Sequence, residues 1–301
     1  MLDVHSSSSS DAPVLPKVPN TVDNSVKDKT ECSLRWRQNM LWVSSMIRGQ
    51  DVPLPALADR GWFLACLTKS RAKAVCIDPS LGVEAIGLWA QACQVAQKPL
   101  FLRIPANPYR PANQKPRAWA IKRGCDLAIA LLLLVILSPL MLVLAGLIKA
   151  QDKGPILQGE WRVGKRGRMF QMLKFRTTVS SDRQAVQDMG ILPTNLTMTA
   201  LGSWLKRSHL DKLPLLLNVL RGDISLVGPH TFAIYETLTL PSELRARLHT
   251  LPGITGSLRQ FAHFPATHPH IVARKDLHEL RHWSLWKDLK KLTVATLQVL
   301  D

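Results

Sequence analysis

The longest apolar segment of the chain covers residues 127–148 and contains no charge, with basic residues at 122–123 and at Lys149 on its flanks. A helix needs roughly 20 apolar residues to cross a bilayer, so this segment is long enough to enter a membrane. Ser138 and Pro139 interrupt its centre. Because proline lacks a backbone donor and clashes with the preceding turn, the pattern predicts a membrane helix kinked at this pair.

The basic flanks leave two arrangements of this helix open. Lysine and arginine prefer the cytoplasmic face, and here both ends carry them. A re-entrant hairpin would bend at Ser138 and Pro139 and return to the same face, with the Ser138 hydroxyl available to a backbone group freed by the proline. A straight bitopic helix with a mild kink is the alternative. The pattern alone does not decide between them.

The region before the membrane segment shows a second pattern. Residues 1–30 are rich in Ser, Pro, Asp and Lys, which predicts a disordered tail. Residues 31–106 alternate short apolar runs with helical spacing, which predicts a small accessory α/β domain with a regulatory or docking role. A proline-containing linker is expected over 107–119. The predicted strands lie at 41–43, 74–77 and 100–102, and the predicted helices at 58–67 and 83–96.

The region after the membrane segment mixes strand and helix patterns. Two strand-like pieces at 156–163 and 168–175, joined by 164–167, predict a hairpin. A short helix is expected over 215–220, beginning after Pro214 and ending at Gly222. The fold class expected for the whole chain is α/β. It combines a re-entrant membrane helix over 120–150, a small α+β catalytic domain over 151–301 and the accessory α/β domain before them.

The net charge of the chain indicates which classes of partner it binds. The 301 residues carry a formal net charge of +17, which requires an anionic partner such as nucleic acid, anionic lipid headgroups or a phosphorylated substrate. The basic residues are dispersed and carry no recognisable nucleic-acid motif, so we expect no nucleic-acid partner and favour lipid and substrate phosphates. Five cysteines without a CxxC pair indicate reduced core thiols in a cytoplasmic compartment.

The candidate chemistry centres on Asp211, at or just before the start of the helix expected over 215–220. An acid at this position most often only caps the helix. Here four basic residues of the same region are candidates for binding phosphate around it: Lys174 and Arg176 at the end of the predicted hairpin, and Lys206 and Arg207 just before Asp211. The same geometry therefore also makes a phosphate pocket with a carboxylate nucleophile.

A series of ordered motifs extends from about residue 121 to 300. The motifs are Lys122-Arg123 with Asp126, Ser138-Pro139, Gly154-Pro155, Arg162-Val163-Gly164, Lys174-Phe175-Arg176-Thr177, Leu210-Asp211 with Leu213-Pro214, Asn218-Val219-Leu220, Gly222-Asp223, Ser225-Leu226-Val227-Gly228-Pro229, Pro252-Gly253-Ile254-Thr255-Gly256 and Trp283-Ser284-Leu285-Trp286 with Asp288-Leu289. With these motifs the chain resembles the monotopic bacterial sugar-phosphate transferases, which load a hexose 1-phosphate onto a polyprenyl phosphate such as undecaprenyl phosphate. The accessory region resembles the cyanobacterial subgroup linked to exopolysaccharide and heterocyst-envelope synthesis.

The resemblance implies a location and a mechanism. The helix would be re-entrant, with the protein monotopic on the cytoplasmic face of the inner (plasma) membrane, against an anionic bilayer. In the family, the Asp of an Asp-Glu pair attacks the sugar-bearing phosphorus of a nucleotide diphosphosugar, and polyprenyl phosphate then collects the sugar phosphate to initiate exopolysaccharide synthesis. Asp211 matches this Asp. Mg²⁺ would neutralise the phosphates, held in part by the family Glu.

The chain departs from the family pattern at that Glu, where Lys212 stands. Leu215 replaces a Gln, His230-Thr231 replaces Arg-Pro, and Lys206 replaces an Arg. One hypothesis is that the Lys212 ammonium supplies part of the charge of the metal. The other is a decayed enzyme that serves as a membrane scaffold with other polysaccharide-assembly proteins. The metal ligands therefore remain unknown at this point. Asn218 and Asp223 are expected to be structural.

A rival motif lies near the end of the chain. Residues 278–282 fit H-E-x-x-H, in which two His one helical turn apart bind zinc and the Glu activates water, as in a metalloprotease. No third ligand is evident. The favoured interpretation is a basic amphipathic helix, carrying Trp283, Leu285 and Trp286, that lies on a bilayer.

Overall fold

A computed structural model describes residues 32–45, 60–104, 116–151, 154–180, 196–241, 244–255, 269–281, 284, 286–288 and 290–291. The predicted tail at 1–30 lies outside these residues, as do most of the predicted linker and the side chains of His282, Trp283 and Leu285. The predictions that fall on them therefore remain predictions.

The accessory unit is a four-stranded sheet with two helices. Its strand order is β1-β2-β3-β4, with β1 antiparallel to β2 and the other pairs parallel. The predicted strands and helices of this unit are confirmed. Strand β1 was not predicted, because its second half is exposed and contains two arginines, so it has no apolar run. The elements are β1 (Cys32–Arg37), β2 (Met40–Ser45), α1 (Arg60–Lys69), β3 (Ala74–Ile77), the 3₁₀ turn η3 (Pro79–Leu81), α2 (Gly82–Val95) and β4 (Leu100–Leu102).

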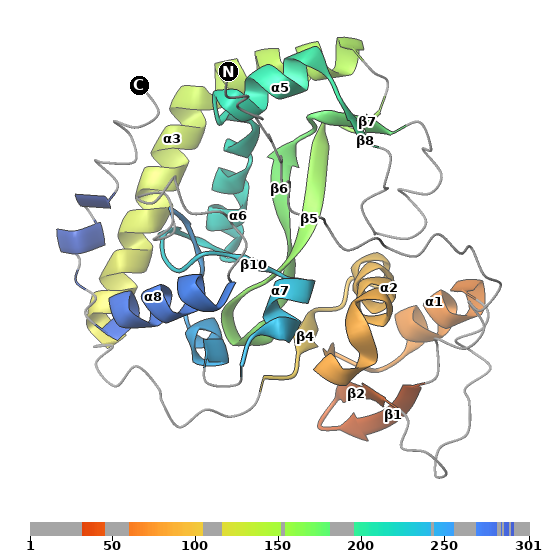
Figure 1. Ribbon diagram of the computed structural model, residues 1–301. Helices are drawn as coiled ribbons and strands as arrows, with labels where there is room; N and C mark the ends of the chain where they lie inside the picture. Colours follow the sequence, from red (N-terminus) through yellow and green to blue (C-terminus); the bar gives the residue numbers. More distant parts are fainter. Residues whose placement is uncertain are drawn as a thin grey trace, which may run out of the picture.

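The accessory unit shares its hydrophobic core with the rest of the chain. Val163, Met169, Ile234 and Leu248 belong to the same buried cluster as the side chains of its sheet and helices. At Gly167, in the turn η4 (Lys165–Gly167), φ is +77° and an added Cβ would lie 2.2 Å from a carbonyl oxygen of β4. Figure 1 shows the unit at the lower right, against the end of the central hairpin. The two parts are therefore packed as one body.

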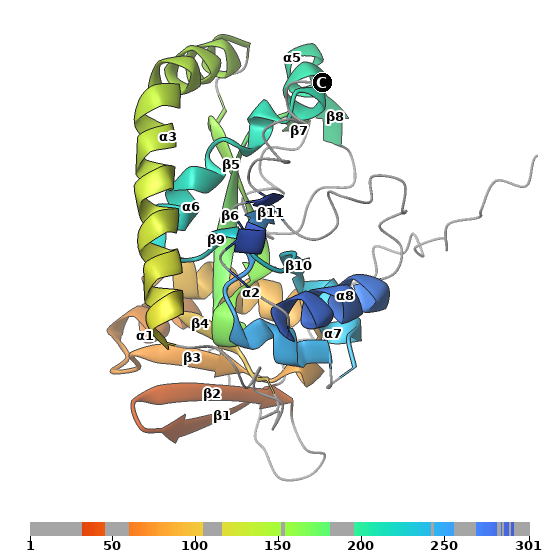
Figure 2. The ribbon, with the colours of Figure 1, turned by 90° about the vertical axis from the view of Figure 1, so that its left-hand side faces the viewer.

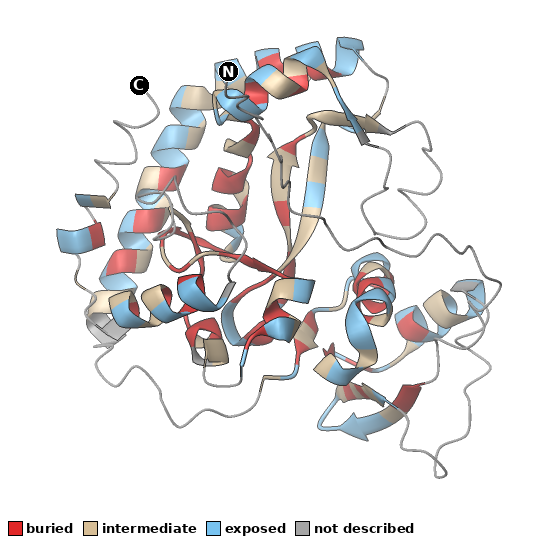
Figure 3. Cartoon of the chain, viewed as in Figure 1, coloured by how far each residue is buried: buried red, intermediate tan, exposed pale blue. Residues whose placement is uncertain are grey.

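The long apolar helix α3 spans Pro116–Gln151, so it begins before the predicted boundary at 120. Among the described residues it is the one helix long and apolar enough to cross a membrane. Its ribbon bends over in its later part, and Pro139 lies inside it (Figure 2). The outer side of the helix is exposed (Figure 3), which leaves a broad apolar surface for a bilayer. That surface includes Leu131, Leu132, Val135, Ile136, Leu142, Val143 and Leu147.

The Ser138 hydroxyl forms a hydrogen bond with the helix backbone at the kink. In a regular helix the backbone N–H of residue 139 would donate to the carbonyl of Val135, but proline has no N–H. Ser138 Oγ donates to that same carbonyl at 2.8 Å. The Ser138 side chain therefore bonds to the acceptor that Pro139 leaves.

We expect Ser138→Ala to destabilise the bent helix by about 1 kcal/mol, the typical net value of one such hydrogen bond. Thermal unfolding in nanodiscs measures the effect. Ser203→Ala is the matched control, because Ser203 Oγ also donates to a carbonyl three residues back, at 2.8 Å, in a helix without proline. Equal shifts for the two variants would contradict the assigned role of Ser138.

The remaining elements build a compact α+β part behind α3. The antiparallel hairpin of β5 (Leu157–Val163) and β6 (Met169–Phe175) confirms the predicted one, and β10 (Phe232–Ala233) pairs with its outer edge. The predicted helix is confirmed as α6 (Leu215–Arg221), which ends at Gly222 with φ +89°. The other elements are β7 (Thr178–Ser180), β8 (Leu196–Met198), α5 (Ala200–Arg207), the 3₁₀ turn η5 (Leu210–Lys212), β9 (Ser225–Val227), α7 (Ile234–Thr239), η6 (Leu244–His249), β11 (Gly253–Thr255) and α8 (Pro269–Arg281).

The segments of α3 before and after Pro139, here called its first and second arms, both pack against this part. In the first arm, Ala130 is buried in a cluster with Val219 of α6 and Leu226 of β9. In the second arm, Leu144 and Ile148 are buried in a cluster with side chains of β6 and α5. The two arms are therefore anchored on two sides of the same α+β part.

Polar contacts hold the beginning of α3. Lys122 Nζ lies 2.8 Å from Asp288 Oδ2 and 3.6 Å from Asp126 Oδ2, and all three residues are buried. Ser225 Oγ donates to Asp126 Oδ2 at 2.5 Å. Arg123 donates to the carbonyl of Val219 at 2.6 Å, at the carboxyl end of α6. These bonds fix α3 to β9 and α6.

The five cysteines are all unpaired, but their burial differs from the expectation. Cys32, Cys76 and Cys93 are buried, and burial raises the pKa of the Cys32 thiol to about 11. Cys66 and Cys125 are exposed on α1 and α3, because each helix buries only one face. The prediction of core thiols is thus right for three positions and wrong for two.

Candidate active site

Asp211 lies in η5, the three-residue turn between α5 and α6. It is 6% exposed, and its Oδ1 has no hydrogen-bond partner among the described residues. Pro214 occupies the cap position of α6, where no side chain bonds to the helix, so the capping interpretation of Asp211 is wrong. An unpaired buried carboxylate oxygen is costly, so the site is built to receive a cation or a donor.

The local sequence explains why the neighbours of Asp211, and not Asp211 itself, pack on the apolar cluster. His209 adopts a left-handed conformation with φ +57° and ends the run of α5. Residues three apart share one face of a 3₁₀ turn, and Leu210 and Leu213 both pack into the cluster of Phe175 and Leu205. Asp211 falls on another face of the turn.

Three charged residues of the β5–β6 hairpin form a cluster. Glu160 Oε2 lies 2.8 Å from Lys174 Nζ, and Glu160 also pairs with Arg162. Arg162 donates to the carbonyl of Thr231 at 3.2 Å. Burial opposes ionisation of Glu160, but the two cations outweigh it and hold its pKa below the usual value. Arg162 also lies 3.5 Å from Glu236 Oε2, so Lys174, predicted as a phosphate ligand, lies in a network of two cations and two carboxylates.

His230 lies where four cations converge. Burial lowers the pKa of its imidazole most, and Arg247, Arg162, Lys212 and Lys174 lower it further, to about 4. The ring is therefore neutral at pH 7. Lys212, one of these cations, is the chain neighbour of Asp211 in η5, and η5 contacts β6, which carries Lys174. We call Arg162, Lys174, Lys212 and Arg247 the cationic cluster.

A buried ion pair holds the His230 loop. Arg247 and Asp276 are 2% and 1% exposed and form an ion pair with each other. Arg247 donates to the carbonyl of His230, and the backbone N–H of His230 donates to Asp276 Oδ2 at 3.2 Å. The Arg247 guanidinium also lies 3.6 Å from the centre of the Phe232 ring. Elements η6 and α8 thereby fix the position of the loop.

Acid is expected to destabilise the protein through His230. Between pH 6.5 and about 4 the unfolded imidazole takes up a proton that the folded one does not, so the free energy of unfolding falls as the pH falls through this window. We expect a loss of roughly 1 to 2 kcal/mol, allowing for partial solvent screening of the ring. Chemical denaturation at pH 7 and pH 4.5 measures it. His230→Gln should reduce the pH dependence, and His270→Gln, which removes an exposed ring, should leave it unchanged; the reverse would contradict the assignment.

The other predicted site residues occupy more peripheral positions. Lys206 and Arg207 are exposed in the last turn of α5. Arg176 follows β6, and its guanidinium lies against Gly154, where an added Cβ would be 1.6 Å from Nη1. Asn218 is fully buried and bonds to the backbone of Leu173 and of Gln171 at 2.9 and 2.8 Å, so its predicted structural role is confirmed.

Asp223 shares that structural role, because its Oδ2 accepts from the Asn218 amide at 3.2 Å. Sequence reasoning missed Glu160, Arg247 and Asp276 as parts of the site. Only Glu160 left a signal: it lies two positions before Arg162 on a strand, so both side chains share one face.

The described residues fit a protein-held metal poorly. No group of three or more His, Cys, Asp or Glu among them could hold a metal ion. Asp211 offers one unpaired carboxylate oxygen, and the residue that follows it in the chain is a lysine, Lys212, which is not a metal ligand. In the rival zinc motif, Glu279 of α8 forms an ion pair with Lys291, and His282 lies outside the described residues. We therefore derive no catalytic step through a metal.

The chemistry of this site, a buried carboxylate followed in the chain by a lysine of the cationic cluster, is compatible with a phosphorylated substrate. Residues 117–301 match the family described as bacterial sugar transferase. Because this match covers more than half of the chain, the protein belongs to that family and is a sugar-phosphate transferase by class.

Three relatives illustrate the similarity. An "Exopolysaccharide production protein ExoY" of Sinorhizobium fredii is 34% identical over 189 residues, which are 58% of this chain and 83% of the relative. An "Undecaprenyl-phosphate glucose phosphotransferase" of Komagataeibacter xylinus is 36% identical over 188 residues, 56% of this chain and 34% of the relative. A "UDP-glucose:undecaprenyl-phosphate glucose-1-phosphate transferase" of Caulobacter vibrioides is 36% identical over 205 residues, 64% of this chain and 76% of the relative.

The matches cover different shares of the relatives and do not include the accessory unit. The chain spans most of the Sinorhizobium protein but only about a third of the Komagataeibacter one. The accessory unit lies before the residues that match the family. The expected resemblance of that unit to a cyanobacterial subgroup therefore stays a prediction.

Proposed function

We propose that the protein transfers a hexose 1-phosphate from a nucleotide diphosphosugar to a polyprenyl phosphate and so initiates exopolysaccharide synthesis, with Asp211 as nucleophile. The observation that carries the proposal is the buried Asp211 carboxylate, whose Oδ1 is unpaired and whose chain neighbour, Lys212, belongs to the cationic cluster. The names of the relatives support the same substrates. The acceptor and the donor class follow from them, while the particular sugar does not.

The chemistry follows from the side chains present. An Asp211 oxygen attacks the phosphorus that bears the sugar, the bond from that phosphorus to the nucleoside monophosphate oxygen breaks, and an aspartyl-linked sugar phosphate forms. An oxygen of the polyprenyl phosphate then attacks the same phosphorus and releases the Asp211 carboxylate. Lys212, Lys174 and Arg162 stabilise the negative charge that develops on the phosphoryl oxygens, most strongly where water is excluded.

The packing of α3 supports a re-entrant helix on the cytoplasmic face of the inner membrane. A straight spanning helix would place its ends on opposite sides of a hydrocarbon core roughly 30 Å thick. Instead, Lys122 near one end pairs with Asp288, and Ile148 near the other end packs with Leu205, within the same α+β part. The basic residues on both flanks agree with this arrangement.

The proposal is tested by incubating the nanodisc-bound protein with polyprenyl phosphate and a panel of nucleotide diphosphosugars, and measuring nucleoside monophosphate. We expect release from at least one donor. If every donor binds and none releases nucleoside monophosphate, the alternative of a decayed scaffold in a polysaccharide-assembly complex replaces the proposed activity.

The same assay tests the role of Lys212. If its ammonium supplies charge that a metal supplies in other family members, release should persist in a chelator and fall by about 10²-fold in Lys212→Ala. Lys69→Ala, which removes an exposed ammonium from the accessory unit, is the control. Complete loss of release on chelation would contradict this role and favour Mg²⁺ as an obligatory cofactor.

A further inference from the structure

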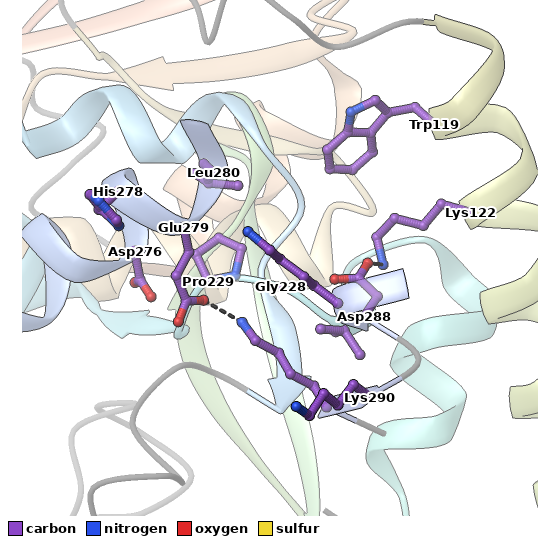
Figure 4. Close-up of a pocket in the computed structure, with 13 residues that line it drawn as sticks. Trp119, Lys122, Gly228, Pro229, Asp276, His278, Glu279, Leu280, Asp288 and Lys290 are labelled. Carbon is purple, nitrogen blue, oxygen red and sulfur yellow. Dashed lines mark hydrogen bonds and ion pairs between the residues drawn. The ribbon is translucent and has the colours of Figure 1, made fainter. Parts of the chain in front are cut away.

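A cavity of ≈ 360 Å³ lies at the beginning of α3. Trp119 and Lys122 of α3 line one side of it, and residues of α8 line another (Figure 4). Gly228 and Pro229 also line it, and the next residue along the chain is His230. The cavity is thus bounded by the loop that carries His230 to the cationic cluster, but it contains none of the residues assigned to the transfer reaction.

The charges that line the cavity favour an anionic ligand. Each of its three carboxylates has a cationic partner: Asp288 with Lys122 at 2.8 Å, Glu279 with Lys291, and Asp276 with the buried Arg247. Lys287 and Lys290 line the cavity as well. Two of the four lysines, Lys122 and Lys291, are themselves among these partners, so the lysines together with Arg247 exceed the three carboxylates by two positive charges, which favours an anionic ligand.

The cavity lies close to the depth of lipid headgroups. The uncharged apolar run begins at Leu127, five residues or about 8 Å along the helix after Lys122. Headgroup layers add about 5 to 8 Å to each side of the hydrocarbon core. Trp286, next to Lys287, is 74% exposed, and tryptophan with lysine is typical of a membrane interface.

We infer that this cavity binds the phosphate-bearing headgroup of an anionic phospholipid. The lysines contact the phosphate, and the apolar wall formed by Trp119, Val227 and Leu280 contacts the glycerol and the first acyl carbons. This function goes beyond sugar-phosphate transfer and does not depend on it. A bound lipid also contacts Gly228 and Pro229, which line the cavity. The lipid composition of the bilayer would thereby influence the position of the next residue, His230.

The experiment titrates the full chain in neutral detergent with dioctanoyl phosphatidylglycerol and measures binding by thermophoresis. We expect saturable binding that Lys287→Gln/Lys290→Gln weakens by at least about tenfold, since each lysine near an anionic headgroup contributes about 1 kcal/mol. The matched control is Lys69→Gln/Lys73→Gln, which removes the same charge from exposed positions of the accessory unit. Trp119→Leu keeps all charges and should weaken binding through the apolar wall.

Several outcomes would overturn the inference. Equal weakening by the control pair would show that bulk charge, and not the cavity, attracts the lipid. Displacement of the lipid by soluble nucleoside monophosphate would assign the cavity to a nucleotide. Displacement by polyprenyl phosphate, lost in Lys287→Gln/Lys290→Gln, would assign it to the acceptor. Binding of the zwitterionic phosphatidylcholine analogue as tight as that of phosphatidylglycerol would also contradict an anionic headgroup site.

Discussion

Asp211→Asn is expected to reduce release of nucleoside monophosphate by on the order of 10⁴-fold, as removal of an essential nucleophile does in other covalent enzymes. The amide has nearly the shape of the carboxylate but is a poor nucleophile. Because the wild-type carboxylate is buried with Oδ1 unpaired, the neutral variant should unfold at the same temperature as wild type or higher. Activity and thermal unfolding measured on one preparation test both statements.

The control for this variant is Asp223→Asn, which changes a nearby acid that bonds to Asn218 and stands outside the proposed chemistry. It should retain activity within a few-fold of wild type. Incubation with the donor alone should add the mass of a sugar phosphate to wild type and not to Asp211→Asn. A mass increase that survives in Asp211→Asn would show that another residue is the nucleophile.

Arg247→Met is expected to lower the free energy of unfolding by about 3 to 5 kcal/mol, because it leaves the carboxylate of Asp276 buried without its cation. It also removes the donor to the carbonyl of His230. Burial lowers the pKa of Arg247 to about 10, opposed by Asp276 and Glu236, so the guanidinium is still charged at pH 7. Denaturant unfolding in micelles measures the loss.

Two further variants serve as controls for Arg247→Met. Arg103→Met breaks an exposed ion pair with Asp78, whose N···O distance is 3.1 Å, and should cost less than about 1 kcal/mol. Arg247→Met/Asp276→Leu removes both buried charges and should recover much of the loss. A double variant as unstable as Arg247→Met would mean that the hydrogen bonds to the His230 loop, and not the buried charge, dominate.

The parts of the fold that follow a local pattern were predictable. The kinked helix, the hydrogen bond of Ser138, the β5–β6 hairpin and the helix ended by Gly222 each depend on residues that lie close together along the chain. For such elements, propensity, turn residues and apolar spacing all point to one structure.

The electrostatic design of the site was not predictable in the same way. Arg247 and Asp276 are separated by 29 positions and meet only because η6 packs on α8. In the sequence, Arg247 is one of many dispersed basic residues, and nothing local distinguishes a buried cation from an exposed one. His230 was noticed as a departure from a family pattern, but its lowered pKa depends first on burial and then on cations from four different elements, which only the folded chain brings together.

The shared core of the accessory unit and the transferase part bears on how such a chain evolves. Val163, Met169, Ile234 and Leu248 would face water in a protein that began at α3, which is a surface prone to aggregation. The close approach of β4 to Gly167 would also be lost, although its φ of +77° would still favour glycine. Loss or replacement of the unit would therefore require compensating changes at these four apolar positions of β5, β6, α7 and η6.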